Sequence, residues 1–128
     1  MAEFSAGDLG AVSMTEVQGC LVVAMPGDAG EETFAQLFDA VSQWLVARRA
    51  PAVVLDFSGV RILDLHEFAR VRTLAKVAGF LGARVFLVAL SPGIAAFLAQ
   101  AGADMGDMHF CLQMEDAFAL MARLAQEA

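Results

Sequence analysis

The stretch VVLDFSGVRILDLHEF, residues 53–68, decides the fold of this chain. It opens with a continuous run of apolar and β-branched side chains, which predicts a buried strand over Ala52–Phe57. Ser58–Gly59 then turns the chain. Asp64, followed three residues later by Glu67, is the capping box that begins an α-helix, because each side chain can accept a hydrogen bond from the other residue's backbone N–H. The stretch therefore predicts a buried strand that leads through a turn into a capped helix.

The same alternation of strands and helices extends along the rest of the chain. Strand patterns cover Ala11–Val17, Cys20–Met25, Arg84–Leu90 and His109–Leu112, and Val60–Leu63 is a short extended stretch. Helical patterns cover Glu31–Arg48, Asp64 to about Leu81, Ser91–Gly102 and Glu115–Gln126. The turn signal Gln18–Gly19 predicts that the first two strands form a hairpin at an edge of the sheet. Apolar strands that alternate with helices need crossover connections, so we expect an α/β fold: a mixed, mostly parallel sheet of four or five strands with about four helices.

One of the predicted helices lacks a charged face. Residues 91–102 contain no charged side chain, and Phe97 is among the apolar residues that line the helix. Ser91 stands at the N-cap and Pro92 at the first helical position, as helix beginnings prefer. A surface helix normally carries a polar face. We therefore expect this helix to be covered on more than one side, partly within the chain and partly by a protein partner.

Length and composition fit one domain. A chain of 128 residues can bury a core without disulfides or metals. We assign residues 11–128 to this domain and residues 1–10, rich in Gly, Ala and acidic side chains, to a flexible tail. Hydrophobic residues make up 59% of the chain, above the roughly 45–50% usual for soluble domains. Either the hydrophobic core is large, or part of the apolar surface is exposed and contacts a protein partner.

The charge balance excludes two classes of partner. Eight basic residues against 15 acidic ones give a net charge of −7, whereas nucleic acids and anionic membranes attract basic surfaces. Apolar runs such as Val85–Leu90 are far shorter than the roughly 18 residues of a membrane span. The first ten residues, MAEFSAGDLG, lack the basic and apolar regions of a secretory signal. We expect a cytoplasmic protein that binds neither nucleic acid nor membrane and has a protein partner.

Signatures of catalysis are absent from the sequence. It contains no glycine-rich dinucleotide or nucleotide motif and no nucleophile elbow of a hydrolase. His66 and His109 have no partner at metal-ligand spacing, and we interpret His109 as a packing residue of a strand. Cys20 and Cys111 lack the basic neighbours that lower a thiol pKa, so we interpret them as reduced core residues. We expect no enzymatic activity, no metal and no other cofactor.

The helix beginning at Asp64 has more than one interpretation. His66 and Glu67 are expected to point outward from a solvated helix start, and a metal or acid–base role for this group is the less favoured alternative. The unpaired N–H groups at such a junction also suit the recognition of an anion such as phosphate.

Two stretches carry a family resemblance. VVLDFSGVRILDLHEF resembles the segment at the centre of STAS domains, the fold of anti-sigma factor antagonists. AGFLGARVFLVALSPGIAAFLAQAGADM, residues 78–105, is similar to a stretch of the RsbS-like stressosome scaffold proteins, in which a turn precedes a strand and a Pro-started helix ends before a Gly-containing loop. The likeness covers about residues 14–126. It implies a four- or five-stranded mixed sheet with packed helices, and partner binding that phosphorylation controls.

The resemblance also implies that the phosphorylation switch is missing here. In the family a GHKL-type kinase phosphorylates a Ser or Thr directly after the Asp that matches Asp64. The corresponding residue is Leu65, which has no hydroxyl, and the second regulatory Thr of the sensor paralogues falls near Phe97. Ser58 and Ser91 are the alternative hydroxyl groups nearby, although a turn and a helix cap account for them.

These observations lead to one hypothesis and two alternatives. The hypothesis is an RsbS-like STAS protein that acts as a scaffold or partner-binding subunit of a bacterial stressosome-type assembly, as a homo-oligomer or in a larger complex. The implied partners are sensor STAS proteins and a GHKL-type switch kinase. The alternatives are a stand-alone antagonist that binds an anti-sigma factor, and a small-molecule or nucleotide sensor or minor enzyme. The predicted partner-binding residues are Ser58, Asp64, Leu65, His66, Glu67, Arg70, Ser91 and Phe97.

Overall fold

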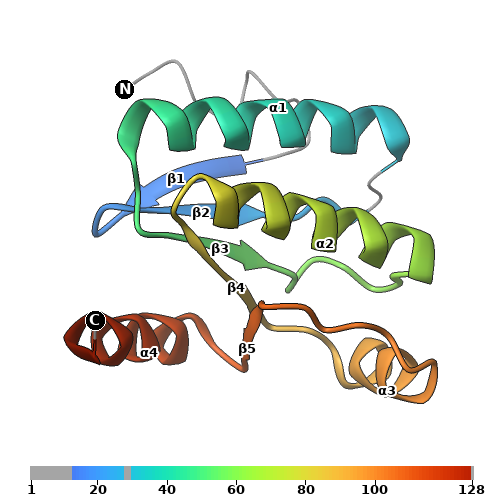
Figure 1. The fold of residues 1–128 in the computed structure, drawn as a ribbon. Coiled ribbons are helices and arrows are strands. Elements are labelled where there is room, and N and C mark those ends of the chain that lie inside the picture. Colours follow the sequence, from blue (N-terminus) through green and yellow to red (C-terminus); the bar gives the residue numbers. More distant parts are fainter. Residues whose placement is uncertain (1–12, 28–29, 128) are drawn as a thin grey trace.

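A five-stranded sheet in the strand order β1-β2-β3-β4-β5 runs through the computed structural model, which describes residues 13–27 and 30–127 (Figure 1). The strands are β1 Ser13–Val17, β2 Cys20–Ala24, β3 Ala52–Asp56, β4 Arg84–Val88 and β5 His109–Cys111. The helices are α1 Glu31–Arg48, α2 Leu65–Phe80, α3 Pro92–Gln100 and α4 Met114–Glu127. The predicted α/β fold is confirmed. Most predicted elements are present with ends that differ by a few residues, and Val60–Leu63 belongs to the irregular segment that precedes α2.

The sheet is mixed because its first strand runs against the others. β1 pairs with β2 in antiparallel fashion, whereas β2–β3, β3–β4 and β4–β5 are parallel pairs. Gln18 and Gly19 connect β1 to β2 with φ angles of 52° and 80°. Two successive positive φ angles are what a tight hairpin turn with the native strand twist requires. The predicted edge hairpin is therefore confirmed.

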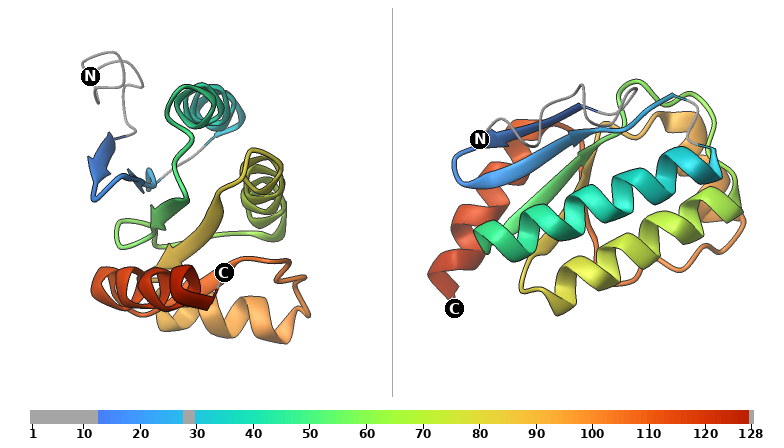
Figure 2. Two further views of the ribbon diagram at one scale, coloured as in Figure 1. Left: turned by 60° about the vertical axis from the view of Figure 1, so that its left-hand side comes forward. Right: turned by 90° about the horizontal axis from the view of Figure 1, so that it is seen from above.

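Helices α1 and α2 lie side by side on one face of the sheet (Figures 1 and 2). The apolar stripe predicted for α1 faces this core, with Phe34, Leu37 and Val41 buried among the strands. Phe68, Leu74 and other residues of the α2 stripe are buried in the same core. Burial of one such side chain is worth about 1.5–3 kcal/mol relative to its exposure, so this face supplies most of the hydrophobic stabilisation.

The opposite face of the sheet is covered mainly by α4 (Figure 1). This second core is smaller, and Ala117 is the buried residue that α4 contributes to it. Cys20 is buried there, as predicted, but Cys111 is only half-buried because it lies on the edge strand β5. His109 is half-buried and its ring stacks on Phe86, with 4.9 Å between the ring centroids, which confirms its interpretation as a packing residue.

Helix α3 is less covered than its sequence predicts. Ile94 and Leu98 are its buried residues, whereas the side chain of Phe97 is 44% exposed. The remaining surface consists mostly of exposed alanine and glycine. The chain therefore supplies the part of the expected cover that faces its own core, and cover by a protein partner stays a prediction. In this fold the outer face of α3, where a surface helix usually carries polar side chains, is uncharged and exposed to solvent.

Two further expectations concern the ends of the chain and the membrane. The predicted flexible tail, residues 1–10, lies outside the described residues, and so do the first two residues of the first predicted strand. Among the helices of residues 13–27 and 30–127, none has the length and apolar character that a bilayer span requires.

Candidate functional site

The loop that leaves β3 is held by hydrogen bonds at its first turn. The Asp56 carboxylate accepts a hydrogen bond from the Ser58 backbone N–H at 2.9 Å, and Val60 N–H donates to Phe57 C=O at 2.9 Å. Phe57 N–H donates to Val88 C=O at 2.9 Å, which extends the parallel pairing with β4 by one residue. This geometry confirms the turn predicted at Ser58–Gly59 and fixes the direction in which the chain leaves the sheet.

Buried apolar side chains anchor the segment between this turn and α2, which we call the corner (residues 57–67). Phe57, Val60 and Leu63 are buried in the core below α2. Ser58 and Ile62, which lie between these anchors, are exposed. The corner is therefore a fixed surface feature, because its anchoring residues cannot leave the core without a large loss of hydrophobic stabilisation.

The capping box predicted at the start of α2 is present. The Glu67 backbone N–H donates to Asp64 Oδ1 at 2.7 Å, and the Asp64 backbone N–H donates to Glu67 Oε1 at 2.9 Å. These two bonds satisfy N–H groups that a helix start otherwise leaves unpaired. Because these two N–H groups are already bonded, fewer remain for an anion, so the structure favours capping over phosphate recognition at the start of α2.

Two apolar side chains are exposed beside this cap. Leu65, the first residue of α2, is 46% exposed, and Ile62 is 78% exposed. His66 is exposed next to Leu65. Exposed aliphatic side chains on a rigid backbone are suited to contact a partner, because their burial gains hydrophobic free energy with little ordering cost.

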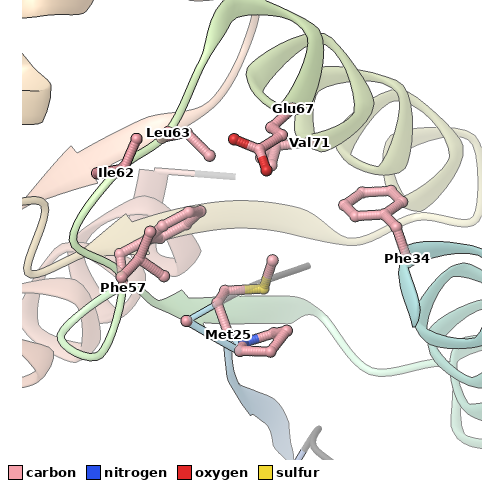
Figure 3. A pocket seen from close by; sticks show the side chains of 10 residues that line it. Met25, Phe34, Phe57, Ile62, Leu63, Glu67 and Val71 are labelled. Carbon is pink, nitrogen blue, oxygen red and sulfur yellow. The ribbon is translucent and has the colours of Figure 1, made fainter. Parts of the chain in front are cut away.

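Glu67 differs from its prediction. Its side chain turns back toward the corner and is half-buried, whereas the sequence suggested an outward direction. Its carboxylate points into a small, mostly apolar pocket whose wall includes Met25, Phe34 and Phe57 (Figure 3). The pocket has a volume of about 20 Å³, which is room for roughly one water molecule. It is too small to enclose a substrate.

The other predicted contact residues lie around the same end of the sheet. Arg70 is half-buried, and its guanidinium lies 3.8 Å from the Glu31 carboxylate of α1. Ser91 caps α3, since its hydroxyl oxygen accepts a hydrogen bond from Ile94 N–H at 3.2 Å. α3 follows β4 and the corner follows β3, and these strands are parallel neighbours, so Ser91 and Ser58 leave the sheet at the same end.

Reactive chemistry has little support in this structure. In the part of the chain that the structure describes, no group of three or more His, Cys, Asp or Glu side chains is arranged to hold a metal ion. Burial raises the pKa of the Cys20 thiol, and burial together with the charge of Asp116 raises the pKa of Cys111. Both thiols therefore stay protonated near neutral pH and are poor nucleophiles.

Comparison with known proteins identifies the family of this chain. The family model for the STAS domain matches residues 11–117. The chain belongs to the STAS domain family. Among curated proteins, none matches the sequence.

Solved structures share the STAS fold with this chain. A serine-to-glutamate variant of Moorella thermoacetica RsbS has a TM-score of 0.77 at 20% identity, over 90% of this chain and 97% of that chain. A chain from the molecular architecture of the stressosome, a signal integration and transduction hub, has a TM-score of 0.75 at 20% identity, over 88% and 97%. The anti-sigma factor antagonist SpoIIAA in its unphosphorylated form has a TM-score of 0.69 at 15% identity, over 88% and 96%. At these identities the likeness shows a common fold.

Sequence reasoning missed one residue of the corner of this STAS domain. Ile62 lies in the short stretch Val60–Leu63, and nothing in the local pattern distinguishes it from the buried Val60 and Leu63. Its exposure follows from the irregular path between Gly59 and Asp64. A Cβ atom added at Gly27 would lie only 3.1 Å from the Gly59 carbonyl oxygen, so the loop after β2 packs closely against this path. A contact between two loops far apart in the sequence leaves no periodic signal.

Proposed function

We propose that this STAS domain is a non-enzymatic scaffold or partner-binding subunit of a cytoplasmic, stressosome-type signalling assembly. The observation that carries the proposal is the exposed Leu65 directly after the capping residue Asp64. By resemblance, this is the position where phosphorylated STAS domains carry a hydroxyl group. A leucine cannot accept phosphate, so its contact with a partner is constitutive.

The corner supplies the physical basis for such a contact. Leu65 and Ile62 present apolar side chains on an anchored backbone. Ser58, Asp64 and His66 are exposed around them, which gives the apolar centre and polar rim that protein interfaces have. The proposed surface also includes Glu67 and Arg70 on α2, and Ser91 and Phe97 at α3. The partners we propose are sensor proteins with a STAS domain and a GHKL-type kinase.

The test uses the kinase and a sensor STAS protein encoded by the same organism. Wild-type chain and the Leu65→Ser variant are each incubated with both proteins and ATP, and phosphate on this chain is quantified by intact mass spectrometry. The wild type is expected to bind the sensor and to remain unphosphorylated, while Leu65→Ser gains about one phosphate. Stoichiometric phosphate on the wild-type chain, at Ser58 or Ser91 for example, would refute constitutive contact.

A second candidate is a stand-alone antagonist that binds an anti-sigma factor. It is favoured by the fold that the chain shares with SpoIIAA over 88% of its length. Size-exclusion chromatography with light scattering separates the two. A large co-assembly with sensor STAS proteins supports the scaffold, and a compact heterodimer with an anti-sigma factor supports the antagonist.

A further inference from the structure

A second hollow lies at the opposite end of α2 from the corner. It is an open groove of about 720 Å³ between the C-terminal half of α2, the beginning of β4 and the loop that leads to β5. This volume falls within the roughly 300–1,000 Å³ typical of small-molecule sites. The groove is far larger than the pocket of about 20 Å³ at the corner. Space for a ligand therefore exists at this end of the domain.

Positive side chains gather in the groove although the chain as a whole is acidic. Arg72, Lys76 and Arg84 line it, which is three of the eight basic residues of the sequence. Two carboxylates, Asp104 and Asp107, also line it, so the cations outnumber the anions here, whereas acids outnumber bases 15 to 8 over the chain. The groove therefore has one more cation than anion on a protein whose net charge is −7, and this local excess favours the approach of anions.

Lys76 and Arg84 are the groove cations available for a ligand, whereas the Arg72 guanidinium lies over the Phe68 ring, 5.9 Å from its centroid. Among the described residues, the ion pairs are Arg48–Glu16 and Arg70–Glu31, and neither involves a residue that lines the groove. The Asp104 carboxylate instead accepts a hydrogen bond from Gly106 N–H at 3.0 Å, which stabilises its own loop. A charged group that binds here can pair with unpaired cations without first breaking an internal ion pair.

The walls of the groove also offer apolar surface. Phe80, the last residue of α2, is 87% exposed and lies one helical turn after Lys76. β5 begins opposite Phe86, so Arg84 and Val85 extend beyond its end and border the groove. An exposed phenylalanine beside two cations suits a ligand with a negative group at one end and a flat apolar body.

We infer that this groove is a binding site for a small organic anion that carries a phosphate or carboxylate group on a planar or apolar body. Lys76 and Arg84 bind the charged group, and Phe80 packs against the body of the ligand. The inference does not rest on the proposed partner contact, because the corner and the groove lie at opposite ends of α2.

The test measures binding of 1-naphthyl phosphate by NMR titration of the ¹⁵N-labelled chain. The backbone N–H signals of Gly79, Gly82 and Gly106, which border the groove, are expected to shift most. Uncharged 1-naphthol is expected to bind about tenfold more weakly, since it lacks the charge-assisted hydrogen bonds. Absence of binding by 1-naphthyl phosphate, or largest shifts at the corner, would overturn the inference.

A matched pair of double variants separates the site from net charge. Lys76→Gln/Arg84→Gln removes two cations of the groove, and Arg61→Gln/Arg123→Gln removes two exposed cations elsewhere. The first is expected to weaken binding about tenfold and the second to leave it unchanged. Phe80→Ser should weaken binding as well, with the thermal midpoint of each variant measured as a folding control. Equal affinities in the two double variants contradict the site.

Discussion

Helices α2 and α3 begin at the same end of the sheet, one after β3 and the other after β4. They differ in length, in the hydrogen bonds of their caps and in the number of their buried side chains. α2 has 16 residues, a reciprocal capping box and four buried side chains. α3 has nine residues, a single cap hydrogen bond from Ile94 N–H to Ser91 and two buried side chains. The difference shows that α2 fixes the position of the corner through its cap and its buried side chains. α3 packs on the core through only two side chains, and its outer surface is exposed to solvent.

The largest expected effect contrasts one aromatic residue from each helix. Phe68 of α2 is completely buried, so Phe68→Ala should lower the free energy of unfolding by about 3–5 kcal/mol. Phe97 of α3 is half exposed, and Phe97→Ala should cost about 0.5 kcal/mol or less. Denaturant unfolding monitored by circular dichroism measures both. Similar losses for the two variants would break the contrast between the helices.

The second effect concerns the two caps. Asp64→Ala removes one half of the capping box and should lower the free energy of unfolding by about 1–2 kcal/mol. Ser91→Ala removes a single bond of 3.2 Å and should cost about 0.5–1 kcal/mol. Asp64→Asn is the control, since an asparagine also caps a helix well and should retain most of the stability. An Asp64→Ala variant as stable as wild type would contradict the role of the box.

The smallest expected effect concerns the residue that connects β4 to the loop before α3. Ala89, directly after β4, has a φ angle of 63°, a left-handed conformation that costs an L-residue about 1–2 kcal/mol. Ala89→Gly relieves this strain at a smaller entropic cost, so the free energy of unfolding should rise by about 0.5–1 kcal/mol. Ala96→Gly inside α3 is the matched control and should be destabilising. A loss of stability in Ala89→Gly would show that the backbone at Ala89 is not strained in solution.

Local signals allowed most of the fold to be predicted from the sequence. The caps at Asp64 and Ser91 depend on side chains within three residues of the N–H groups they bind, so the local pattern identifies them. The buried stripe around Phe68 follows from helical spacing in the same way. These predictions hold because packing in this fold reinforces the local preference.

Features that depend on distant contacts could not be predicted. The exposure of Ile62 depends on how the corner packs against other loops, and the inward turn of Glu67 depends on the space between the corner and α1. The groove brings Lys76 of α2 together with Asp107, which lies in the loop between α3 and β5, after one further strand and one further helix. How much of α3 the chain itself covers could not be predicted either, because an uncharged helix is typical both of a buried element and of an interface.

The most direct test of the central claim is the affinity of the sensor STAS partner for two aspartate variants, measured by isothermal titration calorimetry. Leu65→Asp places a charge in the proposed contact, and Val46→Asp places the same charge on an apolar residue that is 64% exposed near the C-terminal end of α1, which precedes the opposite end of β3. We predict that Leu65→Asp weakens binding by at least about tenfold, as loss of a buried apolar contact does, and that Val46→Asp binds like wild type. Wild-type affinity for Leu65→Asp would contradict the assignment of the corner as the partner-binding surface.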